Sequence, residues 1–198
     1  METTKRQENI RALVEAAMLV ALAYVLSLIT LFRMPQGGSV TPLSMLPILI
    51  IGVRHGLKWG LLGGFVFACL EMITAFWMPP IPTWQAIMSV VMLDYIVAFT
   101  VLGLSGIFKG KRYGLLYAAP ICIFLRFVSH VISGVFVWSE APFAQAFSSG
   151  SIWWFSIVYN GTYLGVELIS VTIIALILCK AAPVIVTPPR RLRNSQSN

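Results

Sequence analysis

Six stretches of almost uninterrupted apolar residues restrict how this chain can fold more than any other feature. They cover about residues 10–32, 42–53, 57–77, 83–108, 113–138 and 151–182. About 20 apolar residues are enough for a helix to cross a bilayer, so only the second stretch is short for a crossing of its own. The stretches are continuous and do not alternate in ten-residue segments, which predicts helices and excludes a transmembrane β-barrel.

The composition agrees with a protein of the membrane. Of the 198 residues, 58% are hydrophobic and only 11% are charged. This length suffices for five or six helices of about 20 residues and leaves no room for a second domain. We therefore predict an all-α integral membrane protein, a six-helix transmembrane bundle in a single domain over residues 1–198, with a basic C-terminal tail at about 187–198.

The net charge of +7 is distributed in a way that predicts topology. The basic residues gather before the first stretch, in alternate connections and after the last stretch. They are Lys5, Arg6, Arg11, Arg54, Lys58, Lys109, Lys111, Arg112, Lys180, Arg190, Arg191 and Arg193. The positive-inside rule then places both termini in the cytoplasm. This distribution favours contact with membrane lipid and argues against a nucleic-acid partner.

One acidic residue lies in the middle of a membrane-spanning stretch. Asp94 stands in the run 86–108, which is otherwise uncharged. A carboxylate at that depth costs roughly 3 kcal/mol on insertion scales, and such residues usually have a partner. A cationic ligand is one candidate partner, and Tyr95 beside it adds an aromatic face and a hydroxyl.

Two further polar residues are expected at a similar depth. At 1.5 Å per residue, Asp94 lies about 16 Å from the outer end of its helix, His130 about 12 Å and Asn160 about 13 Å. The aromatic residues expected near them are Trp84, Tyr95, Trp138, Phe155 and Tyr159. This combination predicts a pocket, open to the outside, for a small, flat ligand that is polar or cationic.

Structural interpretations compete with this one. Trp77 and Trp84 lie near the ends of apolar stretches, where tryptophan is normally an interfacial residue. Arg126, one helical turn from His130, is a candidate ion-pair partner of Asp94 or Glu71. The residues alone leave open whether Asp94 meets a ligand directly or is shared with Arg126.

The sequence contains none of the usual signatures of an enzyme or a metal site. Cys69, Cys122 and Cys179 lie in apolar stretches without a CxxC spacing, and only two histidines exist. No HExxH, GxSxG or GxxxxGK[ST] pattern occurs. We therefore expect no catalytic activity, no metal, no cofactor, and no ATP binding through a P-loop.

The first stretch carries small residues at helical spacing. Ala17 and Ala21 form a small-xxx-small pattern, which lets a second helix approach closely. The second helix could belong to this protein or to a partner.

Several strings along the chain also resemble one known family. They are Met34–Ser39 (MPQGGS), Ser44–Ile48 (SMLPI), Gly56–Gly60 (GLKWG), Leu93–Tyr95 (LDY), Arg126-Phe127 with His130 and Trp138, and Tyr159–Tyr163 (YNGTY). In order and over nearly the whole chain, they resemble the thiamine-specific S component, the substrate-binding subunit, of an energy-coupling factor (ECF) transporter.

This resemblance implies high-affinity capture of extracellular thiamine for an ATP-driven vitamin importer. It also implies a multi-pass protein of a prokaryotic plasma membrane. It implies that Asp94, His130 and Asn160 hold the aminopyrimidine and that aromatic residues enclose the rings. Ala17 and Ala21 would contact a transmembrane coupling subunit, which works with two ATPase subunits. The alternatives are an S component for another vitamin, such as riboflavin, and a stand-alone secondary thiamine transporter.

Overall fold

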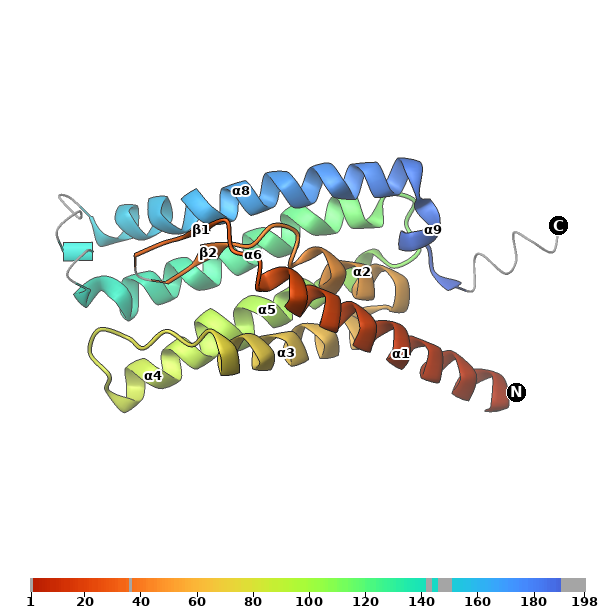
Figure 1. Ribbon diagram of the computed structural model, residues 1–198, viewed down its shortest axis with the longest axis horizontal. Helices are drawn as coiled ribbons and strands as arrows, with labels where there is room; N and C mark the ends of the chain where they lie inside the picture. The colour runs from red at the N-terminus through yellow and green to blue at the C-terminus, as the bar shows by residue number, and fades with distance from the viewer. Residues whose placement is uncertain (1, 36, 142–143, 146–150, 190–198) are drawn as a thin grey trace.

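The computed structural model describes residues 2–35, 37–141, 144–145 and 151–189. Within these residues, five helical segments are long and apolar enough to cross a membrane. They are α1 (Glu2–Ser27), α3 (Leu57–Thr74), the segment Trp84–Phe108, α6 (Gly114–Phe136) and α8 (Ile152–Ala181). A sixth helix, α2 (Leu46–His55), is apolar but shorter. The elements agree with the predicted all-α bundle of six helices, one of them too short to cross alone (Figure 1).

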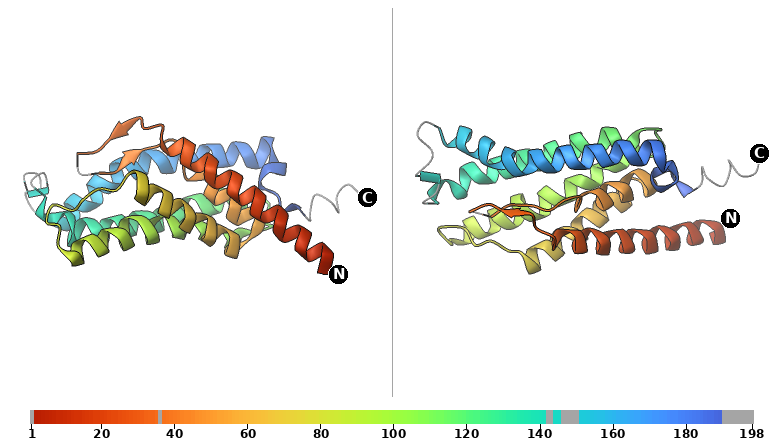
Figure 2. Two further views of the ribbon diagram at one scale, coloured as in Figure 1. Left: turned by 60° about the horizontal axis from the view of Figure 1, so that its bottom comes forward. Right: turned by 45° about the horizontal axis from the view of Figure 1, so that its top comes forward.

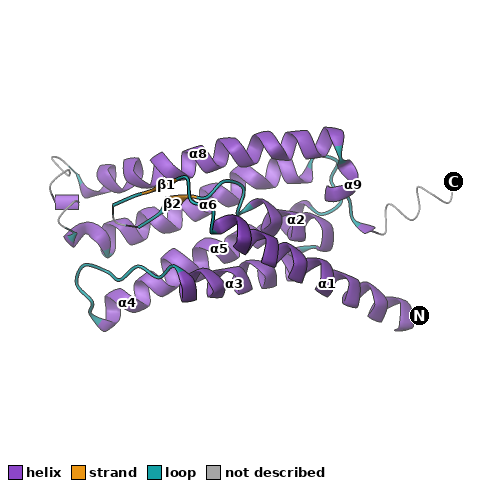
Figure 3. Cartoon of the chain, in the orientation of Figure 1, coloured by secondary structure: helices purple, strands orange, loops and turns teal. Residues whose placement is uncertain are grey.

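The first connection differs from the prediction. Helix α1 ends at Ser27 and not near residue 32, and a small hairpin of β1 (Phe32–Arg33) and β2 (Ser39–Val40) follows it (Figure 3). The sequence predicts only a polar connector here. Gly37 and Gly38 make the hairpin possible, because both have positive φ angles, 84° and 83°, which side chains disfavour. The hairpin is too short to be recognised from an alternating pattern.

Helix α2 lies in the centre of the bundle. Eight of its ten residues are buried, and it packs against α1, α3 and α6. Its Gly52 lies against Ser105 and Gly106 of the fourth span, so closely that a side chain at this glycine would collide with them. Close approach of this kind is how small residues bring helices together in membranes. A helix that protein covers on all sides has no need to match the thickness of the bilayer.

The fourth span is not one uniform helix. It runs through α4 (Trp84–Val90), the π-helical segment η1 (Val91–Val97), α5 (Ala98–Thr100) and the 3₁₀ segment η2 (Val101–Phe108). The sequence predicts a single continuous helix over about 83–108. A π-helical turn widens the helix and re-aims its side chains, and such turns are frequent at functional sites. Here the turn carries Asp94 and Tyr95.

The two described ends of the chain lie at the same end of the bundle. The beginning of α1 and the short helix α9 (Pro183–Val186) are both at the right in Figure 1, and Figure 2 shows the same in two other views. Arg54 of α2 connects these parts, because it donates to Glu15 of α1 at 2.8 Å and to the Val184 carbonyl oxygen at 2.8 Å. Of the predicted basic tail at about 187–198, residues 190–198 lie outside the described residues.

Candidate functional site

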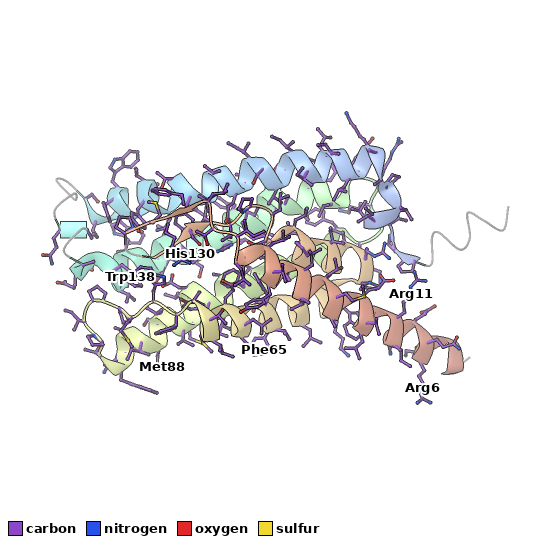
Figure 4. All side chains as sticks on the ribbon, viewed as in Figure 1. Arg6, Arg11, Phe65, Met88, His130 and Trp138 are labelled. Carbon is purple, nitrogen blue, oxygen red and sulfur yellow. The ribbon has the colours of Figure 1, made fainter. Side chains whose placement is uncertain are left out.

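A cavity of about 420 Å³ opens in the half of the bundle that is remote from α9. The end of α1, the β1–β2 hairpin, α3, the π-helical segment, α6 and α8 all contribute to its wall. In Figure 4, His130 and Trp138 lie in this half, whereas Arg6 and Arg11 lie at the opposite end. The volume falls in the range of pockets that enclose small molecules.

Asp94 is the most heavily hydrogen-bonded acid in the cavity wall. Its Oδ1 lies 2.9 Å from His130 Nδ1, and its Oδ2 accepts from Ser133 Oγ at 2.7 Å and from Trp138 Nε1 at 3.0 Å. A carboxylate has about four acceptor positions, so three donors leave room for about one more. The π-helical segment and α6 together therefore hold a pre-oriented carboxylate facing the cavity.

A chain of polar contacts runs from Asp94 into the protein. Arg126 Nε donates to His130 Nε2 at 3.3 Å, so Nδ1 of the same ring carries the proton that Asp94 accepts. Arg126 Nη1 lies 3.6 Å from Glu167 Oε2, and Glu167 Oε1 accepts from Thr41 N at 2.8 Å. The chain thus connects the segment after β2 with α8, α6 and the π-helical segment.

This arrangement decides the open question about Arg126. The arginine forms its ion pair with Glu167, not with either of the partners that the sequence suggests, Asp94 and Glu71. Glu167 is 1% exposed, and the guanidinium also packs over the Phe99 ring at 4.3 Å from its centroid. Within the described part of the chain, Asp94 is linked to Arg126 through His130.

Asn160 lies beside this network on α8. Its Nδ2 donates to the Ser156 carbonyl oxygen at 2.9 Å, and its Oδ1 accepts from Tyr163 Oη at 2.8 Å. Asn160 Nδ2 also lies 3.4 Å from the His130 carbonyl oxygen, so α6 and α8 bring the two residues to the same level. Gly134 of α6 permits this approach, because a side chain there would meet Ser156.

Four of the five predicted aromatic residues line the cavity, namely Tyr95, Trp138, Phe155 and Tyr159. Tyr95 Oη donates to the Ala75 carbonyl oxygen at 2.7 Å and accepts from Trp77 N at 3.0 Å, so its hydroxyl shapes the wall. Tyr159 Oη donates to the Gly37 carbonyl oxygen at 3.0 Å, which ties the hairpin to α8.

Trp84 is the predicted site residue that the structure does not bring into the cavity. It stands at the first residue of α4, is 72% exposed and does not contribute to the cavity wall. Its position fits the interfacial interpretation that the sequence left open. We therefore leave Trp84 out of the site.

The cavity wall also contains residues that the sequence does not place there. Trp77 lines it, although its position near a helix end favours an interfacial role, and Glu71 of α3 lines it as a second acid. The hairpin contributes Gly37, Gly38 and Ser39. The intramembrane position of Glu71 is the one signal that could have identified it, whereas the hairpin residues carry no comparable signal.

These groups can bind a ligand with directional hydrogen bonds. The carboxylate of Asp94 accepts hydrogen bonds, and aromatic faces can stack on flat rings or attract a cation. Among the described residues, the wall holds no nucleophile paired with a base. The donors, acceptors and aromatic faces of the wall can therefore recognise a ligand.

Comparison with known proteins agrees with this description. The sequence profile of the family described as thiamine transporter protein (Thia_YuaJ) matches residues 13–187. The chain belongs to this family. It is also 33% identical to the thiamine transporter ThiT of Bacillus subtilis (strain 168) over an alignment 201 positions long, which covers 93% of this chain and 95% of the relative.

A solved structure of ThiT from Listeria monocytogenes has the same fold as this family member. The two superpose with a TM-score of 0.73 at 27% identity, over 91% of this chain and 99% of the other. These relatives confirm the prediction of an all-helical, multi-pass protein of the bacterial cell membrane that is a transport protein and not an enzyme.

Proposed function

We propose that this chain captures thiamine from outside the cell in the cavity around Asp94. The observation that carries the proposal is a carboxylate, 14% exposed and held by three donors, with an amide and several aromatic rings in the same wall. Thiamine offers the matching parts, an aminopyrimidine and a positively charged thiazolium ring. Membership of the thiamine transporter family supports the same ligand.

The pyrimidine is expected to meet the polar side of the cavity. The free acceptor position of Asp94 suits the exocyclic amino group, which is a donor. His130 contacts Asp94, and Asn160 bonds to the backbone of α8 beside it. Both side chains can exchange these internal hydrogen bonds for contacts with the edge of the pyrimidine ring. Trp138, Phe155 and Tyr159 provide the faces against which the flat rings stack.

We further propose that uptake is driven by ECF partner subunits. No P-loop pattern occurs in the sequence, so the energy of ATP would have to reach this chain through other proteins. Ala17 and Ala21 are exposed on the outer side of α1, whereas Ala12, Ala16 and Ala23 are buried within the bundle. The exposed pair is thus available to a helix of a transmembrane coupling subunit, which would bring the two ATPase subunits.

The orientation follows from this proposal. The cavity lies in the half remote from the beginning of α1 and from α9, and a capture site must face the outside. Both described ends then lie on the cytoplasmic side, in agreement with the positive-inside distribution of basic residues.

A binding titration of the purified protein tests the ligand and the site together. We expect thiamine to quench tryptophan fluorescence, because Trp138 and Trp77 line the cavity. Asp94→Asn removes a charged acceptor worth about 1.5–3 kcal/mol, so the affinity should fall by about 10- to 100-fold. Glu140→Gln, which removes an exposed acid outside the cavity wall, is the matched control and should bind as the wild type does.

Riboflavin, titrated in parallel, separates thiamine capture from its nearest alternative. Tight binding of riboflavin with none of thiamine would refute the proposed ligand. Unchanged thiamine affinity in a folded Asp94→Asn variant would refute the site. Uptake by the chain alone, in vesicles without the ATPase subunits, would instead identify a secondary transporter.

A further inference from the structure

A second acid in the cavity is not explained by the contacts of the site. Glu71 lies in the last turn of α3, and its side chain lines the same cavity as Asp94. Its Oε1 is buried and has no hydrogen-bond partner among the described residues. A carboxylate inside a membrane protein is costly without a partner, so an oxygen of a cavity-lining acid that the protein itself leaves unpaired is available to a ligand.

Two polar side chains that act on the Glu71 carboxyl, those of Ser27 and Arg126, are both engaged elsewhere. Ser27 faces the Glu71 carboxyl, but its hydroxyl donates its single hydrogen to the Tyr24 carbonyl oxygen at 2.8 Å. Arg126 is close enough to act on Glu71 electrostatically, yet its ion pair is with Glu167 and its Nε donates to His130. The positive charge near Glu71 is therefore already committed.

The other cation in the wall does not satisfy Glu71 either. Arg33 lies on β1 with an exposed side chain, and among the described residues it forms no ion pair with the acid of α3. The two acids of the cavity wall thus differ in how far their hydrogen-bonding capacity is used. Asp94 accepts from three donors, whereas Glu71 keeps a buried oxygen unused.

We propose that Glu71 is the counter-charge for a cationic ring of the ligand and thereby selects charged over neutral ligands. The inference rests on the proposed capture of thiamine and assigns the two ends of that ligand to two acids. Asp94, on the π-helical segment, accepts from the amino group of the pyrimidine. Glu71, on α3, faces the thiazolium ring, and the positive charge of this ring balances the negative charge of the carboxylate. Glu71 is half-buried in the cavity wall, so the attraction is stronger there than it would be in bulk water.

The test compares two ligands that differ in charge and hardly in shape. One is thiamine, and the other is its analogue with a neutral thiophene ring in place of the thiazolium. Glu71→Gln keeps the size of the side chain and removes its charge. We expect this variant to bind thiamine at least about tenfold more weakly and the neutral analogue within about twofold of the wild type.

Three further variants make the comparison specific. Glu71→Asp keeps the charge and should lose less affinity for thiamine than Glu71→Gln does. Asp94→Asn should lower the affinity for both ligands, because it removes a contact with the pyrimidine ring that they share. Glu140→Gln changes the net charge equally from an exposed position outside the cavity wall and should change neither affinity.

The outcomes separate this inference from the proposed function. Binding of the neutral analogue shows that the Glu71→Gln variant is folded. If Glu71→Gln weakens the binding of both ligands equally, or of neither, while the wild-type protein binds thiamine and Asp94→Asn binds it more weakly, the role of Glu71 is refuted and thiamine capture stands. If the wild-type protein does not bind thiamine, both are refuted.

Discussion

Replacing Arg126 with methionine should destabilise the protein strongly through Glu167. The arginine is the only ion-pair partner of Glu167 within the described part of the chain, and the two charges lie 3.6 Å apart. Methionine fills a similar volume and removes the charge. The glutamate, 1% exposed, would then remain as an unpaired buried acid, although Thr41 would still donate to it.

The magnitude follows from distance and burial. Two unit charges 3.6 Å apart attract by about 5 kcal/mol at an effective dielectric constant of 20. Protonation of Glu167 and rearrangement recover part of this energy, and breaking one partner of a buried pair typically costs about 3–5 kcal/mol. For a chain of this length, a loss of 3 kcal/mol lowers the melting temperature by roughly 6–12 °C.

Thermal unfolding of the purified variants in one detergent measures the effect. The double variant Arg126→Met with Glu167→Gln removes both charges, so it should regain most of the lost melting temperature, while Gln still accepts from Thr41 N. Arg112→Met, which removes an exposed arginine, is the matched control and should melt within about 2 °C of the wild type, as surface substitutions usually do.

The pairing has a clear refutation. If Asp94→Asn rescues Arg126→Met and Glu167→Gln does not, then Arg126 neutralises Asp94 and the described pairing is wrong. An unchanged melting temperature in Arg126→Met would show that the ion pair contributes no net stability.

Two other predictions address the outer side of α1 and the cavity wall. Replacing both Ala17 and Ala21 with leucine should leave the affinity for thiamine within about twofold of the wild type, because both side chains point away from the bundle, but it should abolish uptake by the reconstituted complex. Undiminished uptake would rule out docking at these residues. The control is Ile169→Phe, at an exposed position of α8. Tyr95→Phe removes the bonds to the Ala75 oxygen and the Trp77 nitrogen, so the melting temperature should fall by an amount equivalent to about 1–3 kcal/mol. Stability equal to that of the wild type would show that the hydroxyl does not hold the wall.

The fold class could be predicted because the bilayer imposes it. A backbone in hydrocarbon must satisfy its own hydrogen bonds, so the length and continuity of the apolar stretches are enough to indicate helices and their number. The cost of placing a charge inside the membrane likewise indicated Asp94 as a candidate site residue from the sequence alone. These inferences depend on single stretches of the chain and on the solvent around them.

Partners in space could not be predicted in the same way. Arg126 pairs with Glu167, 41 positions away, and not with Asp94 or Glu71, because the rotation of α6 against α8 decides which acid faces the guanidinium. The π-helical turn at Asp94 and the hairpin over the cavity leave no periodic signal in the residues. Trp77 and Trp84 are the same residue type at similar helix ends, yet only Trp77 lines the cavity.

The physical reason for this division is the range of the interactions. Transfer of a side chain from water into lipid depends on the side chain alone, so it can be read along the chain. A hydrogen bond or an ion pair requires two groups within a few ångströms and a suitable orientation, and these depend on how whole helices pack. For this protein, the stretches that cross the membrane follow from local composition, and the set of groups that lines the cavity follows from the packing of α3, α6 and α8 around the π-helical turn.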